Sequence, residues 1–416
     1  MTRRFNYANG DNSEDLGFSL WCVQMGKSPF INRWALQEFA LYIVEQYGEM
    51  YKSHGFSLSK SFKGCSRNLV MGNNALTIKQ LKSNMPYKPS NLFTCKGRTC
   101  VSCGYKLALG DVAEVMRGIQ EYAYSAAESE DASPEPIAGR SVIQICLTCS
   151  HSRDESLETV RKDNMRARSL FEMDRNVIGL LKEIGVDAEC ISNESPYGDN
   201  GWSFHPHMLF FCHTAVDTAS LEESLTPIWQ DKVYKVGRNA ITGPCLSVDG
   251  GESVKTYLSK QAFELAYGNY GKDRGGFSHL RTPFHILYDC AEWYYWAVKE
   301  FGDESRAPGY ELWLNDVLVY LEWMDTMRGK RFFRWTPISR SVFPWLQSDE
   351  KKVEEYDQNG NTIIHILNGR IFWKSLSAAE RFEIQRYGIY DDVEGLKSFV
   401  DQKGFAYIDG EKKEES

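Results

Sequence analysis

Residues 204–212, FHPHMLFFC, decide the expected fold, because this apolar stretch is predicted to be a strand that carries two histidines. Side chains alternate between the two faces of a strand, so His205 and His207 project from the same face. Three further strands are predicted from apolar runs, at residues 141–149, 186–191 and 244–249. The histidine strand is therefore expected to belong to a sheet.

Segments with the apolar spacing of helices separate these strands. They are predicted at residues 155–184, at 218–233, and from the fourth strand to about residue 267. The order strand, helix, strand, strand, helix, strand, helix is typical of an α+β domain. We therefore expect an α+β fold with a central, mainly antiparallel sheet and flanking helices.

Composition excludes few classes of protein. The chain has 416 residues with a net charge of −8, from 48 Lys+Arg and 56 Asp+Glu. Local patches decide phosphate binding more than the total charge does, so a nucleic-acid partner stays possible. No apolar run approaches the roughly 20 residues of a membrane span, and no secretory signal is recognisable. We expect a soluble cytoplasmic protein with no membrane partner.

Polar, turn-forming stretches suggest where the chain divides. Loops are expected at residues 126–140, 193–201 and 347–360. The last of these opens an acidic segment, 347–416, which we expect to be a solvated or partner-binding extension. The expected segments are consecutive: 1–136, 137–290, 291–346 and 347–416. No G-x-x-x-x-G-K-[ST] loop is present, so ATP hydrolysis by that route is excluded.

The two histidines of the strand suit a catalytic divalent metal. Two imidazoles leave room for an oxygen ligand and for a substrate. Glu189, in the strand 186–191, is the preferred carboxylate, because a strand holds a ligand rigidly. Glu194, in the loop that follows, is the alternative. The competing interpretation is that His205 and His207 are surface or core residues that bind no metal.

The segment 254–260, VKTYLSK, carries a second chemical feature. On a helix Tyr257 and Lys260 lie three positions apart and share a face. A phenolate can attack a phosphodiester while a metal polarises the phosphoryl oxygens and an ammonium group neutralises developing charge. The competing interpretation is a packed tyrosine beside a solvated lysine.

Four cysteines have the spacing of a structural zinc site. The chain has 11 cysteines, an odd number that favours reduced thiols over a disulfide framework. Three of them follow a C-x4-C-x2-C pattern, and one more lies upstream. The expected zinc ligands are Cys65, Cys95, Cys100 and Cys103. The alternative is a group of small buried core residues.

A basic and aromatic stretch at residues 328–335 suits contact with DNA. Cationic side chains neutralise phosphates and aromatic rings stack on bases. The expected DNA-binding residues are Arg328, Lys330, Arg331 and Arg334. An amphipathic element that covers the sheet is an equally good interpretation.

The order of these motifs resembles the rolling-circle plasmid replication initiator (Rep) proteins, which belong to the HUH endonucleases. ICLTCSH (145–151), GWSFHPH (201–207) and VKTYLSK (254–260) are similar to the three motifs of that family. The cysteine segment, RTPFHIL (281–287) and residues 322–340 resemble landmarks of one branch. The resemblance covers roughly residues 60–340.

The resemblance implies a fold and a mechanism. Residues 137–290 would form the HUH nicking and joining domain, 291–346 the rest of the Rep core, and 1–136 a zinc-binding region. Tyr257, assisted by Lys260, would nick one strand at the double-strand origin of a plasmid and stay linked to the 5′ phosphate, with Mg²⁺ or Mn²⁺ as cofactor. A host helicase would unwind the DNA, a host DNA polymerase would extend the 3′ end, and the strand would be rejoined at termination.

The same residues are compatible with two other classes of function. A mobilisation relaxase or a transposase would use the same core chemistry. A zinc-stabilised DNA-binding regulator would bind DNA without cleaving it, and its histidine pair would be inert.

Overall fold

The computed structural model describes residues 33–52, 58–81, 83, 85–125, 135–239, 245–250 and 280–410. These residues form two compact units. The first unit takes its residues from 1–107, 286–321 and 348–416, and the second from 108–285 and 322–347. Each unit is thus assembled from separated stretches of chain, unlike the four consecutive segments expected from the sequence.

The second unit is built on a five-stranded antiparallel sheet with the strand order β8-β3-β7-β4-β9. The histidine strand β7 lies at its centre, paired on one side with β3 and on the other with β4. A short hairpin, β5 and β6, joins β4 to β7. The strands are β3 (Ser141–Leu147), β4 (Val186–Glu194), β5 (Tyr197–Gly198), β6 (Gly201–Trp202), β7 (His205–Cys212), β8 (Leu246–Gly250) and β9 (Phe333–Trp335).

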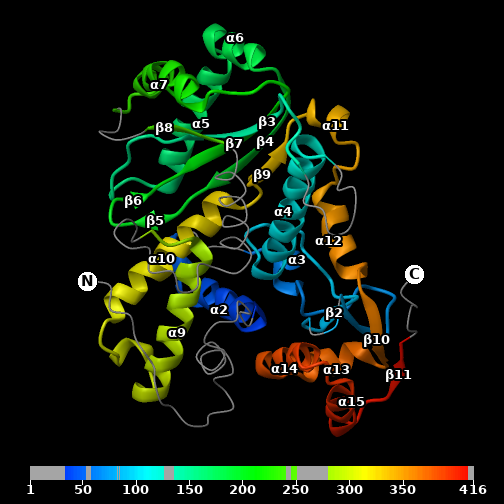
Figure 1. Cartoon of the computed structure of the whole chain (residues 1–416). Coiled ribbons are helices and arrows are strands. Elements are labelled where there is room, and N and C mark those ends of the chain that lie inside the picture. The colour runs from blue at the N-terminus through cyan, green and yellow to red at the C-terminus, as the bar shows by residue number, and fades with distance from the viewer. Residues whose placement is uncertain are drawn as a thin grey trace. The chain divides into compact units, whose positions relative to one another are not determined.

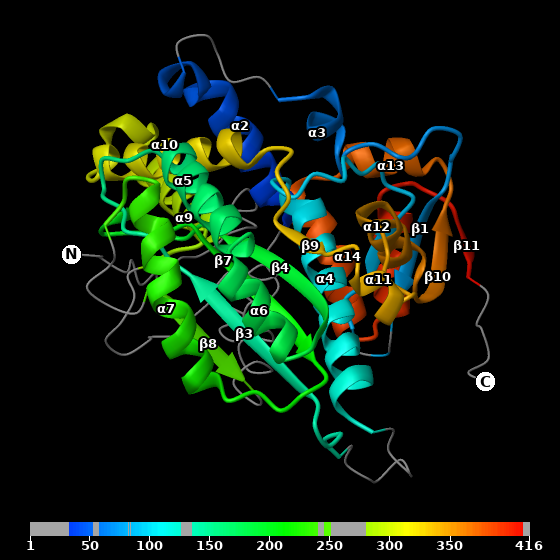
Figure 2. The same cartoon turned by 90° about the horizontal axis from the view of Figure 1, so that it is seen from above.

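Helices cover both faces of this sheet (Figures 1 and 2). One face packs against α5 (Leu157–Glu172), α6 (Arg175–Glu183) and α7 (Thr218–Lys235) around a core that includes Phe171 and Trp229. The other face packs against α4 (Val101–Ala123) and α11 (Ser339–Val342). Successive residues of a strand point to opposite faces, so alternate apolar side chains of β3, β4 and β7 enter the two cores.

The first unit has a four-stranded antiparallel sheet with the order β11-β10-β1-β2. Its strands come from both ends of the chain: β1 (Leu76–Gln80), β2 (Lys88–Ser90), β10 (Asn361–Ile366) and β11 (Tyr407–Asp409). The segment 347–416 is therefore not an appendage. Ile364 and Ile366 are fully buried against the apolar side chains of β1, and burial of that kind fixes the strand in the core.

Some helices of the first unit are formed by residues near the strands in the sequence, and others by the segment 286–321. They are α2 (Arg33–Tyr51), α3 (Lys60–Gly64), α9 (Pro283–Phe301), η2 (Glu304–Arg306), α10 (Tyr310–Met327), α12 (Asp349–Gln358), α13 (Gly369–Ser375), α14 (Ala378–Ile389) and α15 (Val393–Gln402). Both α9 and α10 extend into residues assigned to the second unit. Most of the stretch 347–360, expected to be a loop, is helix α12. Ser348 caps the N-terminus of this helix by accepting a hydrogen bond from the Lys351 N–H.

The α+β class and the antiparallel sheets expected from the sequence are confirmed. All four strands occur where the apolar runs predict them. The helix expected at 155–184 is two helices, because Asp174 caps a new N-terminus at α6. The helix expected after the fourth strand falls outside the described residues. Among the residues that the structure describes, no helix is long and apolar enough to cross a membrane.

Candidate metal centre

The two histidines begin strand β7 and point to the same side of the sheet. His207 is paired with Cys146 on β3 and with Ser192 on β4. Their face is the one that α4 covers further along the strand, where Leu209 and Phe211 are buried. The His207 side chain is 6% exposed and that of His205 is 15% exposed. The pair therefore sits at the edge of a packed face, where solvent still reaches it.

The carboxylate that faces the two histidines belongs to Glu194. Strand β4 extends as far as this residue, which sequence analysis assigned to a loop, and Glu194 pairs directly with His205. Its Oε2 lies 3.3 Å from Nε2 of His205 and 3.4 Å from Nε2 of His207. One carboxylate oxygen thus faces both imidazole nitrogens.

The structure does not bring Glu189 to the histidines. Glu189 pairs with Phe210, five residues beyond His205 along β7. Ile191, two positions along β4, and Phe210 both pack on the α5–α7 side of the sheet, and strand periodicity places Glu189 on that side as well. The sequence analysis preferred Glu189 to Glu194 as the carboxylate ligand, and this geometry does not agree with that preference. The choice depends on the register of β4 on β7, which the sequence does not give.

Glu189 instead belongs to a group of charges on the other face. Burial, together with the negative charge of Glu172, raises its pKa to about 7, while Arg168 and Arg334 act in the opposite direction. Arg168 is 3% exposed and its Nε lies 3.1 Å from a carboxylate oxygen of Glu172. Ionisation of Glu189 therefore costs free energy in the folded state.

This raised pKa predicts a pH effect on stability. Because the folded-state pKa lies above the unfolded value of about 4.3, the contribution of Glu189 is complete below pH ~4.3 and is lost as pH rises through 7. Glu189→Gln should flatten the fall in unfolding free energy across this window and be the more stable protein at pH 8. Urea unfolding at pH 5 and pH 8 measures this. Glu183→Gln, at an exposed position on α6, is the control, and an unchanged slope in Glu189→Gln would contradict the assignment.

The electrostatics of the site favour a negatively charged Glu194 beside a positively charged His207. Burial of Glu194 opposes its ionisation, but the positive charge of His207 and hydrogen bonds from both imidazoles hold the pKa of Glu194 well below its usual range. Burial likewise opposes the charging of His207, yet the negative groups Cys146 and Glu194 raise its pKa. The pKa of Cys146 is lowered to about 7, since His207 outweighs the effect of burial. The negative groups Glu194 and Cys146 thus lie beside the positive imidazole of His207 at a partly buried site.

Two polar groups behind the imidazoles orient them. Nδ1 of His205 donates to the Ser203 carbonyl at 2.9 Å, which leaves Nε2 to face the carboxylate. Nδ1 of His207 lies 3.1 Å from the side-chain amide nitrogen of Gln144, and Gln144 is 2% exposed. With the amide turned so that its oxygen faces the ring, it would accept from Nδ1–H and leave the Nε2 lone pair of His207 free for a metal ion. Such outer partners are typical of metal-ligating histidines.

The donor set fits a divalent cation. Ligand bonds of about 2.0–2.2 Å at near-tetrahedral angles separate neighbouring donor atoms by about 3.4 Å. The Glu194 oxygen is 3.3 Å and 3.4 Å from the two imidazole nitrogens. Cys146, His205 and His207 also offer ligand atoms that all lie within 4.8 Å of one another. The residues present are therefore suited to holding one metal ion.

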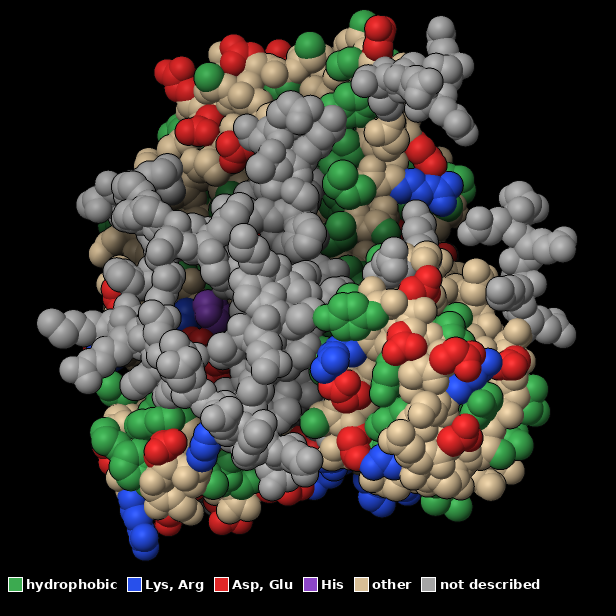
Figure 3. Space-filling model, turned by 60° about the horizontal axis from the view of Figure 1, so that its bottom comes forward, with side chains coloured by type: hydrophobic (Ala, Val, Ile, Leu, Met, Phe, Trp, Pro, Cys, Tyr) green, Lys and Arg blue, Asp and Glu red, His purple; other side chains and the backbone are tan. Residues whose placement is uncertain are grey.

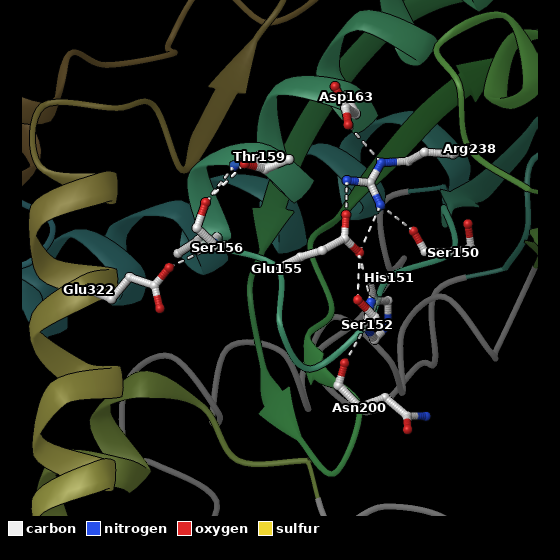
Figure 4. Close-up of polar contacts among 11 residues, drawn as sticks. Ser150, His151, Ser152, Glu155, Ser156, Thr159, Asp163, Asn200, Arg238 and Glu322 are labelled. Carbon is white, nitrogen blue, oxygen red and sulfur yellow. Dashed lines mark hydrogen bonds and ion pairs between the residues drawn. The ribbon is translucent and has the colours of Figure 1, made fainter.

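Polar contacts fix the loop that leaves β3 and contains His151 (Figure 4). Arg238 is buried, and its guanidinium donates to Glu155 at 2.7 Å, to Asp163 at 2.9 Å and to the Ser150 carbonyl at 2.6 Å. Nδ1 of His151 is 2.9 Å from the Asn200 carbonyl, to which it donates. The motif 145–151 is thus fastened to α5 and to the β5–β6 hairpin.

Tyr257 and Lys260 lie outside the described residues. The chain reaches them after β8, which pairs with β3 on the opposite side from β7. Gly250, the last residue of β8, pairs with Ile143. Their assignment as nucleophile and partner stays a prediction.

The basic stretch is divided between solvent and core. Arg328, Lys330 and Arg331 are exposed, whereas Arg334 lies half-buried on the edge strand β9. Trp335 packs on Phe211 and its indole N–H donates to Glu114 at 3.0 Å, so this ring is engaged within the unit. Acidic and basic side chains are interspersed on the face shown in Figure 3. The stretch thus combines exposed cations with an element that covers the sheet edge.

The four predicted zinc ligands come together in the first unit. The sulfur of Cys65 is 3.3 Å from that of Cys103 and 3.5 Å from that of Cys100, and Cys95 and Cys103 are 3.8 Å apart. Zn–S bonds of about 2.3 Å in a tetrahedron would place the sulfurs about 3.8 Å apart. The four thiols therefore form a cluster that could hold a structural metal such as zinc.

The four thiols differ in how readily they lose their protons: the pKa is lowered at Cys65 and Cys103 and raised at Cys95 and Cys100. Cys65, Cys100 and Cys103 are fully buried. A hydrogen bond from Cys100 is the main cause of a lowered pKa at Cys65, and one from Cys100 also lowers the pKa of Cys103. Burial raises the pKa of Cys100, whose S–H lies 3.4 Å from the side-chain oxygen of Gln37 on α2. A metal ion would stabilise the thiolates that burial alone disfavours.

Sequence reasoning missed two members of the histidine site, Cys146 and Gln144. Both alternate with apolar residues on β3 and so share a face, a signal that was present in residues 141–147. What the sequence does not give is the pairing of β3 with β7, which puts Cys146 opposite His207.

Comparisons of this chain with protein families, with curated proteins and with solved structures find no match.

Proposed function

We propose that this protein nicks and rejoins a DNA strand as the initiator of rolling-circle plasmid replication, with the HUH endonuclease fold. The observation that carries the proposal is the carboxylate of Glu194, which faces the imidazoles of both His205 and His207 on a partly exposed sheet face. The motif order resembling Rep proteins supports the same conclusion. The exposed cations Arg328, Lys330 and Arg331 give DNA phosphates a place to bind.

Each residue has a chemical role in this proposal. A divalent cation held by Glu194, His205 and His207 would supply Lewis acidity toward a phosphoryl oxygen. The Tyr257 oxygen attacks phosphorus, forming an O–P bond to the 5′ phosphate while the bond to the 3′ oxygen breaks. The phenol loses its proton and the 3′ oxygen takes one up. Lys260 neutralises the charge that develops on the phosphoryl group.

Rejoining is the reverse displacement. A 3′ hydroxyl attacks the phosphotyrosine, the O–P bond to Tyr257 breaks, and the strand is sealed without an external energy source. Gln144 and Ser203 act through the imidazoles, since they hold the rings in the orientation that faces Glu194. Unwinding and synthesis would be supplied by a host helicase and a host DNA polymerase.

A covalent-adduct assay tests the proposal. Single-stranded oligonucleotides that carry a label at the 3′ end and tile the DNA around the gene are incubated with the protein and Mg²⁺, Mn²⁺ or Zn²⁺, and then run on a denaturing gel. We expect a labelled protein band from one oligonucleotide. Tyr257→Phe should abolish the band while DNA binding persists. Tyr267→Phe, which changes the tyrosine ten positions further along the chain, is the control and should retain the band.

The same assay separates the competing functions. Sequence-specific binding with no cleavage by the unaltered protein would overturn the proposal in favour of a zinc-stabilised regulator. An adduct that forms on a transfer origin or a transposon end, and not on the replication origin, would assign the chemistry to a relaxase or a transposase.

A further inference from the structure

Cys146 flanks the histidine strand on the side opposite to Glu194. It lies on β3 and pairs directly with His207, whereas Glu194 lies on β4 and pairs with His205. Alternation along β3 puts Cys146 on the same face as Gln144, whose amide contacts Nδ1 of His207. The two imidazoles are therefore bordered by a carboxylate on one side and a thiol on the other.

The thiol is close enough to share an ion with the imidazoles. The ligand atoms of Cys146, His205 and His207 all lie within 4.8 Å of one another. At a tetrahedral angle, a Zn–S bond of about 2.3 Å and a Zn–N bond of about 2.0 Å separate sulfur from nitrogen by about 3.5 Å, so rotamer changes of these side chains would complete the site. Cys146 is half-buried, and among the described residues its sulfur has no disulfide partner.

We propose that Cys146 is a ligand of the metal held by His205, His207 and Glu194, and that its sulfur makes this centre select a thiophilic ion of the Zn²⁺ or Co²⁺ class over Mg²⁺. The inference rests on the metal-binding part of the proposed function. On binding, the sulfur–metal bond forms and the thiol proton leaves to solvent.

Ligand softness is the physical reason for this selectivity. Carboxylate, carbonyl and water oxygens suit Mg²⁺, imidazole suits zinc and other transition metals, and thiolates select soft or borderline ions. Two nitrogens, one oxygen and one sulfur form a set in which Mg²⁺ has one favourable protein ligand. The donor set thus argues against the Mg²⁺ that the sequence resemblance implies, and Mn²⁺ lies between the two.

Cobalt absorption measures the thiolate directly. The full-length protein is first loaded with one equivalent of Zn²⁺, for the four-cysteine cluster, and then titrated with Co²⁺, while released zinc is monitored to exclude exchange there. We expect a sulfur-to-cobalt charge-transfer band without zinc release. Cys146→Ser should lose that band and bind Co²⁺ at least about tenfold more weakly, because even outer partners of metal ligands are worth that much. Its Mg²⁺ affinity should change by less.

Matched variants keep the test interpretable. Cys190→Ser removes a buried thiol from β4, outside the group formed by Cys146, His205 and His207, and should keep the band. Cys146→Asp replaces sulfur with oxygen and should shift the preference from Co²⁺ toward Mn²⁺ and Mg²⁺. A charge-transfer band that persists in Cys146→Ser, or equal Co²⁺ affinities for Cys146→Ser and the unaltered protein, would overturn the proposal.

The outcomes distinguish this inference from the proposed function. Loss of the band in Cys146→Ser, in a protein that forms no DNA adduct, would retain the ligand and reject the nickase. Adduct formation that requires His207 but leaves metal affinity independent of Cys146 would retain the nickase and reject the ligand.

Discussion

Cys103→Ala should lower the free energy of unfolding by at least about 4 kcal/mol and remove the sensitivity of the protein to chelators. Cys103 is fully buried, and its sulfur lies within 3.8 Å of those of Cys65 and Cys95. Structural zinc contributes on the order of 10 kcal/mol in small zinc-binding peptides, and binding of that kind is folding free energy. Because the first unit also has an apolar core, we expect a smaller but still large loss.

Urea unfolding with and without EDTA measures this effect, together with the zinc content of the purified protein. EDTA should destabilise the unaltered protein strongly and have little further effect on Cys103→Ala. Cys190→Ala, a buried thiol of the second unit, is the matched control and should cost about 1 kcal/mol with its zinc retained. Equal losses in the two variants, with no response to EDTA, would show that the four thiols are packed without a metal.

Glu194→Gln should lower the rate of the proposed strand nicking by at least about 100-fold, whereas Glu189→Gln should leave it within a factor of about three. The Glu194 oxygen faces both imidazoles at 3.3 Å and 3.4 Å, and an amide there loses the negative charge that offsets a cation. Glu189 is on the other face of the sheet, five register positions along β7. The two substitutions are chemically identical, so their difference isolates position.

Single-turnover cleavage of the labelled origin strand at several metal concentrations measures the rates. If the defect of Glu194→Gln is in metal binding, excess metal should restore part of the rate. A larger defect in Glu189→Gln than in Glu194→Gln would reject the site geometry described above.

Local sequence patterns were sufficient for most of the second unit. Apolar runs located β3, β4, β7 and β8, because a strand buried on both faces has a nearly continuous apolar sequence. Alternation placed His205 and His207 on one face, and cysteine spacing identified the four thiols that cluster in the first unit. These patterns are local in the sequence, so they can be recognised without any knowledge of tertiary contacts.

Long-range pairing was not predictable in the same way. The choice between Glu189 and Glu194 depends on the register of β4 on β7, and the contact of Cys146 with the histidines depends on the register of β3. One residue of slip reverses every side chain, so these assignments require the fold itself. Residues 361–366 are half apolar within an acidic segment, and the acidic composition concealed a central strand.

The sheet order β11-β10-β1-β2 has a consequence for protein synthesis. Thr77 on β1 contacts His365 on β10, a partner 288 positions later in the chain. A nascent chain on the ribosome therefore carries β1 with one edge unprotected until residue 366 has emerged, whereas four strands of the other sheet are available by residue 250. Loop closure over such a distance is slow and exposes an aggregation-prone edge. We expect translation arrested before β10 to yield chains in which the sheet of the second unit is folded, while β1 and β2 still depend on a chaperone.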